Sequence, residues 1–198
     1  MIAVIDYKAG NLTSVMKALD ALGCAATVTA DPAVVRGAGK VILPGVGHFQ
    51  ATQLLQTSGL TDAVREVIAR GVPFLGICVG LQWLFEGSTE AEGIRGLGVF
   101  NGRCERFEAG VKVPHVGWNE IRVDGKSRLM EGVADRSFVY YTHSYRAPVI
   151  AETVGLTDYG GPFSGAVERG NVMGVQFHPE KSGATGMRVL QNFVGLAC

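Results

Sequence analysis

The chain has 198 residues, in which 18 Lys and Arg balance 18 Asp and Glu, so its formal net charge is zero. Hydrophobic residues make up 47% of it, and this hydrophobicity without net charge excludes an intrinsically disordered chain. Because there is no basic excess, we also expect no nucleic acid among its partners.

Neither the start of the chain nor its apolar runs indicate export or membrane insertion. Met1–Asp6 lacks the basic segment and long apolar stretch of a signal peptide. Gly71–Phe85 is uncharged and apolar, but it is shorter than the ~20 residues of a membrane-spanning helix. The four cysteines are far apart in the sequence: Cys24, Cys78, Cys104 and Cys198. The sequence therefore contains no C-x-x-C pair, and it predicts neither a zinc site nor a disulfide framework. We therefore expect a cytoplasmic protein without a metal site or a membrane partner.

In the first half of the chain, apolar strand-like runs alternate with helical patterns. The expected strands are Ile2–Asp6, Lys40–Leu43 and Pro73–Ile77. The expected helices run from Leu12 to a stop at Gly23, from Thr61 to a stop at Gly71, and over Val79–Glu86. This alternation predicts βαβ units and a mainly parallel central sheet flanked by helices.

The second half consists mostly of short apolar runs separated by Gly, Asp and Pro, which predict hairpins and an antiparallel extension of the sheet. These runs are Glu120–Val123, Phe138–Tyr141, Val149–Gly155 and Val172–Phe177. Thr185–Leu196 then has the spacing of a closing amphipathic helix. Because we find no repeat or linker, we expect residues 1–198 to form a single α/β domain.

The strongest chemical signal is Gly76–Gly80, which reads GICVG between an expected strand and an expected helix. A sharp turn in this context, a nucleophile elbow, holds its central residue in a strained conformation, and the flanking glycines avoid clashes. Cys78 would then lie at a helix N-terminus, which favours the reactive thiolate. Taken alone, the motif fits a buried structural cysteine about as well. The other three cysteines lack this setting, and we interpret them as structural.

A nucleophilic cysteine needs a base, and His178 is the best placed of the four histidines. It follows an expected strand, and in an extended segment His178 and Glu180 would point to the same side. The carboxylate could then orient the imidazole, as a Cys-His-carboxylate triad requires. Taken alone, this pair is more simply a surface His–Glu contact. We interpret His48 as a helix cap, and the aromatic neighbours of His115 and His143 favour structural or interface roles.

Three of these segments together resemble the triad (class I) glutamine amidotransferases. The segments are Pro44–Gly47 (PGVG), Gly76–Gln82 (GICVGLQ) and Gln176–Glu180 (QFHPE), and their order and wide separation also match. The resemblance extends over nearly the whole chain. It implies the single-domain fold of that family, with an antiparallel extension of a mainly parallel sheet.

Four more segments resemble the glutaminase subunits of imidazole glycerol phosphate synthases, which act in histidine biosynthesis. They are Asp6–Leu12 (DYKAGNL), Pro114–Asn119 (PHVGWN), Thr142–Ala147 (THSYRA) and His178–Gly183 (HPEKSG). The chain departs slightly from that family, because Val79 and Trp83 stand where leucine-type residues are common. Both substitutions keep the helix apolar.

The resemblance implies a role for each matching residue. Cys78 is expected to attack the side-chain carboxamide of L-glutamine, His178 to transfer the proton, and Glu180 to orient His178. No metal or organic cofactor is implied. Residues expected to form the oxyanion hole or to hold the substrate are Val46, Gly47, Val79, Gln82, Glu90, Ser144 and Tyr145.

The resemblance also implies a partner, a separate (β/α)₈-barrel cyclase subunit that would receive ammonia within a heterodimer. Asn11, Trp118, Tyr140 and Lys181 match positions that face this partner. Considered alone, Trp118 fits a core aromatic and Lys181 a solvated charge. Three alternatives stay open: a glutaminase subunit of a chorismate- or purine-type synthase, a stand-alone γ-glutamyl thiol hydrolase, and a non-catalytic interaction module.

Overall fold

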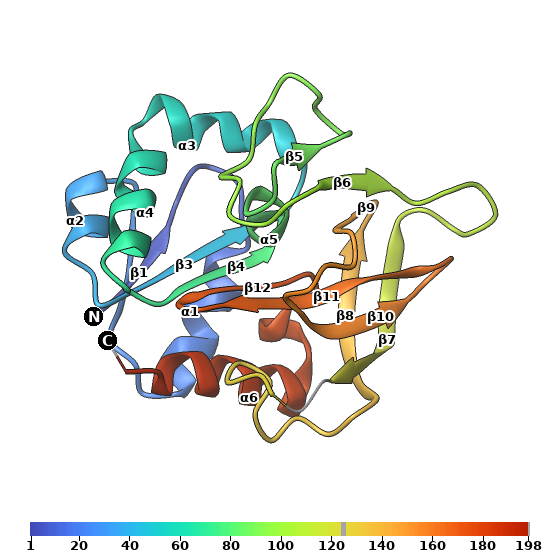
Figure 1. Ribbon diagram of the computed structural model, residues 1–198. Helices are drawn as coiled ribbons and strands as arrows, with labels where there is room; N and C mark the ends of the chain where they lie inside the picture. Colours follow the sequence, from blue (N-terminus) through green and yellow to red (C-terminus); the bar gives the residue numbers. More distant parts are fainter. Residues whose placement is uncertain (124–125, 198) are drawn as a thin grey trace.

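The computed structural model describes residues 1–123 and 126–197 (Figure 1). Its main feature is a nine-stranded sheet with the strand order β2-β1-β3-β4-β12-β11-β10-β7-β8. The strands are β1 (Ile2–Ile5), β2 (Ala26–Thr29), β3 (Lys40–Gly45), β4 (Phe74–Cys78), β7 (His115–Val123), β8 (Ser137–His143), β10 (Thr153–Asp158), β11 (Pro162–Arg169) and β12 (Val172–Val175).

The sheet has a parallel part and an antiparallel part that meet at β12. Strands β2, β1, β3, β4 and β12 pair in parallel. From β12 through β11, β10 and β7 to β8, every pairing is antiparallel. The predicted fold class, an α/β fold with an antiparallel extension, is therefore confirmed.

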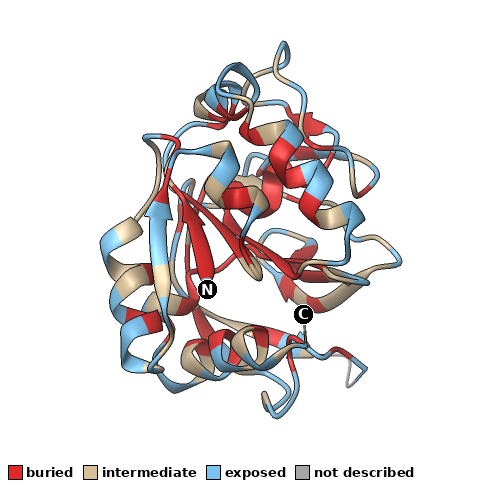
Figure 2. Ribbon diagram, turned by 90° about the vertical axis from the view of Figure 1, so that its left-hand side faces the viewer, coloured by how far each residue is buried: buried red, intermediate tan, exposed pale blue. Residues whose placement is uncertain are grey.

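Helices cover both faces of the parallel part (Figure 1). Helices α1 (Leu12–Ala21) and α6 (Gly183–Gly195) lie together on one side. Most of the remaining helices lie on the other side: α2 (Pro32–Arg36), η1 (Phe49–Thr52), α3 (Gln53–Thr57), α4 (Leu60–Ala69) and α5 (Val79–Trp83). Strands covered on both faces are expected to be apolar throughout, and β1, β4 and β12 are buried at every residue (Figure 2).

The structure shortens one predicted helix and lengthens several predicted strands. Helix α5 ends at Trp83 instead of Glu86, because the backbone carbonyls of Trp83 and Leu84 accept hydrogen bonds from Leu97 and Phe100 in a later loop. Strand β3 continues through Gly45, and β7 begins at His115 instead of Glu120.

Other corrections concern the second half and the sheet edges. The strand predicted over Val149–Gly155 begins only at Thr153. Two strands of the large sheet were not predicted: the edge strand β2, of which two residues are exposed, and β11, whose apolar pattern is broken by Ser164 and Gly165. A second sheet was not predicted either, and it consists of β5 (Gly87–Ser88), β6 (Arg103–Arg106) and β9 (Tyr145–Arg146). Two-residue strands carry no periodic pattern and are fixed only by their partners.

None of the helices in the described part of the chain has the length and apolar character needed to cross a membrane.

Candidate active site

The site begins at the carboxyl end of β4, between its parallel neighbours β3 and β12. Cys78 ends β4 and is the N-cap of α5, with φ of 55° and ψ of −108°, an unusual conformation for a residue with a side chain. A Cβ on Gly76 would lie 2.4 Å from the Gly80 carbonyl oxygen, and one on Gly80 would lie 1.9 Å from the Leu43 carbonyl oxygen. The two glycines therefore allow the strained turn that presents Cys78.

His178 and Glu180 follow β12 and form a buried pair. His178 Nδ1 lies 2.9 Å from Glu180 Oε1, and both side chains are 1% exposed. The predicted extended segment is wrong, because Pro179–Lys181 form a 3₁₀ turn (η2) that His178 precedes as N-cap. This turn, and not strand alternation, brings the carboxylate back to the imidazole.

The electrostatics of this pair favour a charged imidazole. Burial lowers the pKa of His178, but Cys78 and Glu180 act more strongly together and raise it to about 10. His178 Nε2 and Glu180 Oε2 are buried and have no hydrogen-bond partner among the described residues. Cys78 and Glu180 together outweigh burial, so a charged His178 imidazole is favoured between them.

A cavity of about 220 Å³ lies next to Cys78 and gathers most of the predicted substrate residues. Its lining includes Gly47, Cys78, Val79, Gln82, Glu90, Ser144 and Tyr145. Pro114, Thr142 and His143 complete the lining. Val46 is not among the lining residues, although it precedes Gly47, which turns with a φ of 97°.

Hydrogen bonds fix several groups around this cavity. Gln82 donates from Nε2 to the Tyr145 carbonyl at 2.9 Å and to Gln176 Oε1 at 3.2 Å. Glu90 Oε2 accepts from the backbone N–H of Phe49 at 2.7 Å, so the Glu90 carboxylate anchors the segment that follows the Gly47 turn. The Ser144 carbonyl accepts from the Phe107 N–H.

The four residues predicted to face a partner divide into two groups. Asn11 donates to Glu180 Oε1 at 3.4 Å and so contacts the His178–Glu180 pair. The other three cluster on the surface, where the Trp118 and Tyr140 rings are 6.0 Å apart and Lys181 Nζ lies 5.9 Å from the centre of the Tyr140 ring.

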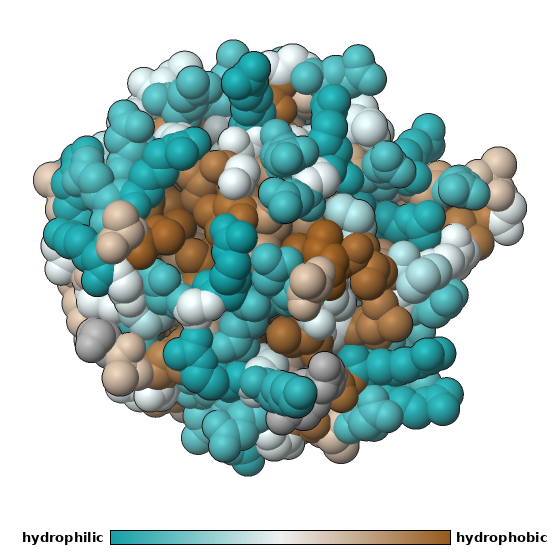
Figure 3. All heavy atoms as spheres, in the orientation of Figure 1, coloured by the Kyte–Doolittle hydropathy of each residue, from teal (hydrophilic) through white to brown (hydrophobic). Residues whose placement is uncertain are grey.

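Exposed apolar side chains extend this surface cluster along β7 and β8. Val116, Trp118 and Phe138 are each more than half exposed. Trp118 pairs with Tyr140 across the two strands, and Val116 and Phe138 lie two residues away on the same face. On the view in Figure 3, apolar surface appears in separate patches between hydrophilic side chains. We call the group Val116, Trp118, Phe138, Tyr140 and Lys181 the hairpin face.

The remaining histidines have structural contacts. His48 caps η1 by accepting from the Gln50 N–H at 3.1 Å. His115 and His143 are buried among aromatic rings, and the sequence did not indicate their direct contact, 3.0 Å between His115 Nδ1 and His143 Nε2. Burial lowers the pKa of His115 to about 4 and is the main reason that the pKa of His143 falls to about 3.

Gln176 is the functional candidate that sequence reasoning missed. Its side chain is fully buried, and its Nε2 lies 3.6 Å from Cys78 Sγ. Gln176 opens the motif that contains His178, but its approach to Cys78 depends on the pairing of β12 with β4, in which Val175 is in register with Ile77.

The other two cysteines of the described residues form no comparable site. Cys24 is half-buried and Cys104 is buried, both as free thiols, and burial raises the pKa of Cys104. Cys198 lies outside the described residues. Within residues 1–123 and 126–197, no group of three His, Cys, Asp or Glu side chains could hold a metal ion.

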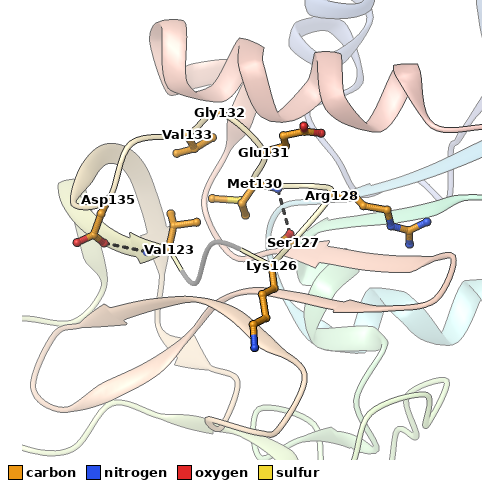
Figure 4. Close-up of a pocket in the computed structure, with 9 residues that line it drawn as sticks. All are labelled: Val123, Lys126, Ser127, Arg128, Met130, Glu131, Gly132, Val133 and Asp135. Atoms are coloured by element: carbon orange, nitrogen blue, oxygen red, sulfur yellow. Dashed lines mark hydrogen bonds between the residues drawn. The ribbon is translucent and has the colours of Figure 1, made fainter.

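A larger cavity, of about 530 Å³, lies elsewhere, near the loop around Ser127 and Met130 (Figure 4). Its hydrogen bonds serve the loop itself: the Met130 N–H donates to Ser127 Oγ, and the Val123 N–H donates to Asp135. Arg128, another lining residue, forms an ion pair with Glu168. None of the residues predicted for chemistry lines this cavity.

Comparison with protein families shows the family to which this chain belongs. A family model described as "Glutamine amidotransferase class-I" matches residues 3–196. The chain belongs to the class I glutamine amidotransferase family. Within this family, the chain is 50% identical to "Imidazole glycerol phosphate synthase subunit HisH" of Moorella thermoacetica, over 97% of this chain and 93% of that one. It is 48% identical to the protein of the same name from Thermococcus kodakarensis, over 98% of both chains.

Two solved structures share the fold. One described as "Crystal structure of glutamine amidotransferase" superposes with a TM-score of 0.77 at 20% identity, over 98% of this chain and 97% of that one. Another, described as "Structure of PurLQS from Thermotoga maritima", has a TM-score of 0.72 at 19% identity, over 98% of this chain and 96% of that one.

Proposed function

We propose that this chain is the glutaminase subunit of an imidazole glycerol phosphate synthase, acting as a single domain in the cytoplasm. It hydrolyses L-glutamine to glutamate and ammonia and passes the ammonia to a (β/α)₈-barrel cyclase subunit in a heterodimer. The relatives named as subunits of that synthase, matched over nearly the full length of both chains, support this function. The observation that carries the chemistry is the combination of Cys78 on the wall of the cavity with the buried His178–Glu180 pair, in which Cys78 and Glu180 raise the pKa of His178 against the effect of burial.

The reaction follows from the charges of these groups. The Cys78 thiolate attacks the side-chain carbonyl carbon of glutamine, and Glu180 keeps the His178 imidazolium oriented. The Val79 N–H at the start of α5, together with an N–H from the Val46–Gly47 turn, stabilises the oxyanion. Collapse of the tetrahedral intermediate breaks the C–N bond, and His178 protonates the leaving ammonia.

A thioester between Cys78 and the glutamyl group remains after ammonia leaves. His178, now neutral, takes a proton from water, and the hydroxide attacks the thioester carbon. Expulsion of the Cys78 sulfur restores the thiolate–imidazolium pair and releases glutamate. Gln82, Glu90, Ser144 and Tyr145 line the cavity and hold the amino acid part of the substrate.

The hairpin face is the proposed docking surface for the cyclase subunit. It offers large exposed apolar side chains, which are typical of a surface that a partner covers. It also adjoins the catalytic residues, because the Tyr140 carbonyl accepts from the His178 N–H at 2.9 Å. Asn11 reaches Glu180 from the β1–α1 loop and completes this connection.

The test compares glutamine hydrolysis with cyclisation. We expect Cys78→Ser to lower glutamine hydrolysis by at least about 10³-fold, because a serine at this position has no base-activated thiolate. Cyclase activity of the complex with added ammonium salt should persist. Equal loss of both activities would contradict the division of labour, and turnover of γ-glutamyl peptides without a partner would favour the stand-alone hydrolase.

A further inference from the structure

We propose that Gln176 is a further catalytic group of this site, donating its side-chain N–H to the Cys78 sulfur, and that a hydrogen-bonded chain from His115 holds it in that orientation. The proposal rests on the glutaminase function proposed above. It assigns a task to three buried polar residues that the triad chemistry does not use, namely Gln176, His143 and His115.

The first step is the contact at the sulfur. Gln176 Nε2 lies 3.6 Å from Cys78 Sγ, a distance suited to an N–H···S hydrogen bond. The other hydrogen-bond contact of this sulfur is longer, 4.0 Å to the Thr142 carbonyl oxygen. An N–H donor stabilises an ionised sulfur more than a protonated one, because hydrogen bonds to charged groups are the stronger kind.

The second step is the orientation of the two amides, which the Tyr145 carbonyl decides. This carbonyl can only accept, so the Gln82 atom 2.9 Å from it is Nε2. The same Nε2 lies 3.2 Å from Gln176, whose facing atom is therefore the acceptor Oε1. Gln176 consequently turns its N–H group, and not its oxygen, toward Cys78.

The third step fixes the Tyr145 carbonyl. It accepts a second hydrogen bond from His143 Nδ1 at 2.8 Å, which makes this nitrogen the protonated one. His143 Nε2 therefore accepts from His115 Nδ1, 3.0 Å away. Asn119 Nδ2 lies 3.4 Å from His115 Nε2 and is the last member of this series of hydrogen bonds. In this arrangement the Nε2 atoms of His143 and His115 both accept, which requires both histidines to be neutral.

The surroundings keep the two histidines neutral. His115 is stacked between Tyr141 and Tyr159, with ring centres 4.9 and 3.9 Å away, and burial is followed by His115 among the causes that disfavour a charge on His143. Their lowered pKa values, about 4 and about 3, agree with this arrangement. The hydrogen bonds from His115 to Gln82 therefore keep the same donors and acceptors over the pH range in which glutamine hydrolysis would be measured.

The experiment measures the thiolate directly, as the rate of Cys78 alkylation by iodoacetamide against pH, with the modified cysteine identified by mass spectrometry. The titratable groups near this sulfur are His178 and Tyr7, which interact with Cys78 electrostatically, and Glu90, His143 and Tyr145, which line the same cavity. We expect Gln176→Met, which removes the donor at similar volume, to move the midpoint of the profile to higher pH by about 1–2 units. Gln56→Met, at an exposed position on α3, is the matched control and should leave the midpoint unchanged.

A second pair of variants, both at His143, tests the hydrogen bonds that hold Gln176 in its orientation. His143→Asn keeps an N–H donor near the Nδ1 position, whereas His143→Leu removes it. We expect His143→Leu to raise the alkylation midpoint by about half as much as Gln176→Met, and His143→Asn to stay near the wild type. These two variants also decide the matter if Gln176→Met does not fold.

Two results would overturn the proposal: an unchanged midpoint in folded Gln176→Met, or equal midpoints for His143→Asn and His143→Leu. Because alkylation needs neither glutamine nor a partner, its outcome is independent of the proposed function. A protein with the expected alkylation shifts that fails to hydrolyse glutamine would refute the glutaminase proposal alone.

Discussion

Two regions of the molecule bury histidines, and the burial has opposite consequences. His178 lies between Cys78 and Glu180, and its pKa is raised to about 10. His115 and His143, in the aromatic cluster beneath the β7–β8 hairpin, have pKa values lowered to about 4 and about 3. All three side chains are almost completely removed from solvent.

The difference lies in the partners and not in the burial. Burial alone disfavours a charged imidazole, which is the outcome in the aromatic cluster. At His178 a carboxylate 2.9 Å away and the nearby thiol outweigh burial. One region can therefore exchange protons during a reaction, while the other keeps fixed tautomers that hold neighbouring groups in place.

Removing the Glu180 carboxylate should have the largest effect, because His178 then loses the charged partner that His115 and His143 lack. We expect Glu180→Gln to lower kcat for glutamine hydrolysis about 10²- to 10⁴-fold, since a neutral amide cannot stabilise the imidazolium. The titration midpoint of His178, measured by NMR, should also fall from about 10 toward its ordinary value. Glu92→Gln, at an exposed position, is the control, and comparable activity of the two variants would disprove the role of Glu180.

Next in size is the backbone packing that presents Cys78. A Cβ at Gly80 would lie 1.9 Å from the Leu43 carbonyl oxygen, so Gly80→Ala should lower the free energy of unfolding by about 3 kcal/mol or more. Gly93 is exposed and has no atom within 4 Å of such a Cβ, so Gly93→Ala should change it by less than about 0.5 kcal/mol. Urea denaturation measures both, and equal stabilities would mean that the elbow tolerates a side chain.

The opposite pKa shifts predict opposite pH dependences of stability. The folded-state pKa values of His115 and His143 lie below the unfolded value of about 6.5, so the unfolded chain binds more protons as the pH falls, and stability decreases. At pH 5 the loss should be about 1–2 kcal/mol for each histidine. The raised pKa of His178 contributes stability that is complete below pH about 6.5 and is lost as the pH rises through about 10.

Urea denaturation between pH 5 and pH 10 tests this prediction with one variant. Relative to the wild type, His143→Asn should lose less stability between pH 7 and pH 5, because it has one fewer histidine to protonate on unfolding. Its behaviour between pH 7 and pH 10 should match the wild type, since His178 is intact. An unchanged loss on the acid side would show that the His115–His143 pair does not govern acid stability.

The last expected effect concerns the outer side of the hairpin. Trp118→Ala should weaken binding of the cyclase subunit about 10- to 100-fold, because large aromatic side chains dominate the affinity of interfaces. Val149→Ala removes another half-exposed apolar side chain, outside the hairpin face, and should leave the Kd unchanged. Isothermal titration calorimetry measures the affinity of the cyclase subunit for each variant. Equal affinities would mean that the cyclase subunit docks on a different surface.

The sequence by itself was sufficient to predict the turn at Cys78, the fold class, and the place of His178 directly after a strand. These features have local causes: the glycines at 76 and 80 avoid specific backbone clashes, and β1, β4 and β12 are apolar because helices cover both faces of the sheet. For the same reason, the resemblance to class I glutamine amidotransferases could be recognised from short motifs.

Only the tertiary structure decided how the polar groups around Cys78 are connected. Glu180 reaches His178 through a 3₁₀ turn that alternation along a strand did not predict. His115 and His143 meet because β7 and β8 place them opposite each other, and Gln176 reaches Cys78 because β12 lies beside β4. A hydrogen bond between residues about a hundred positions apart depends on strand register, which no local pattern of a single chain specifies.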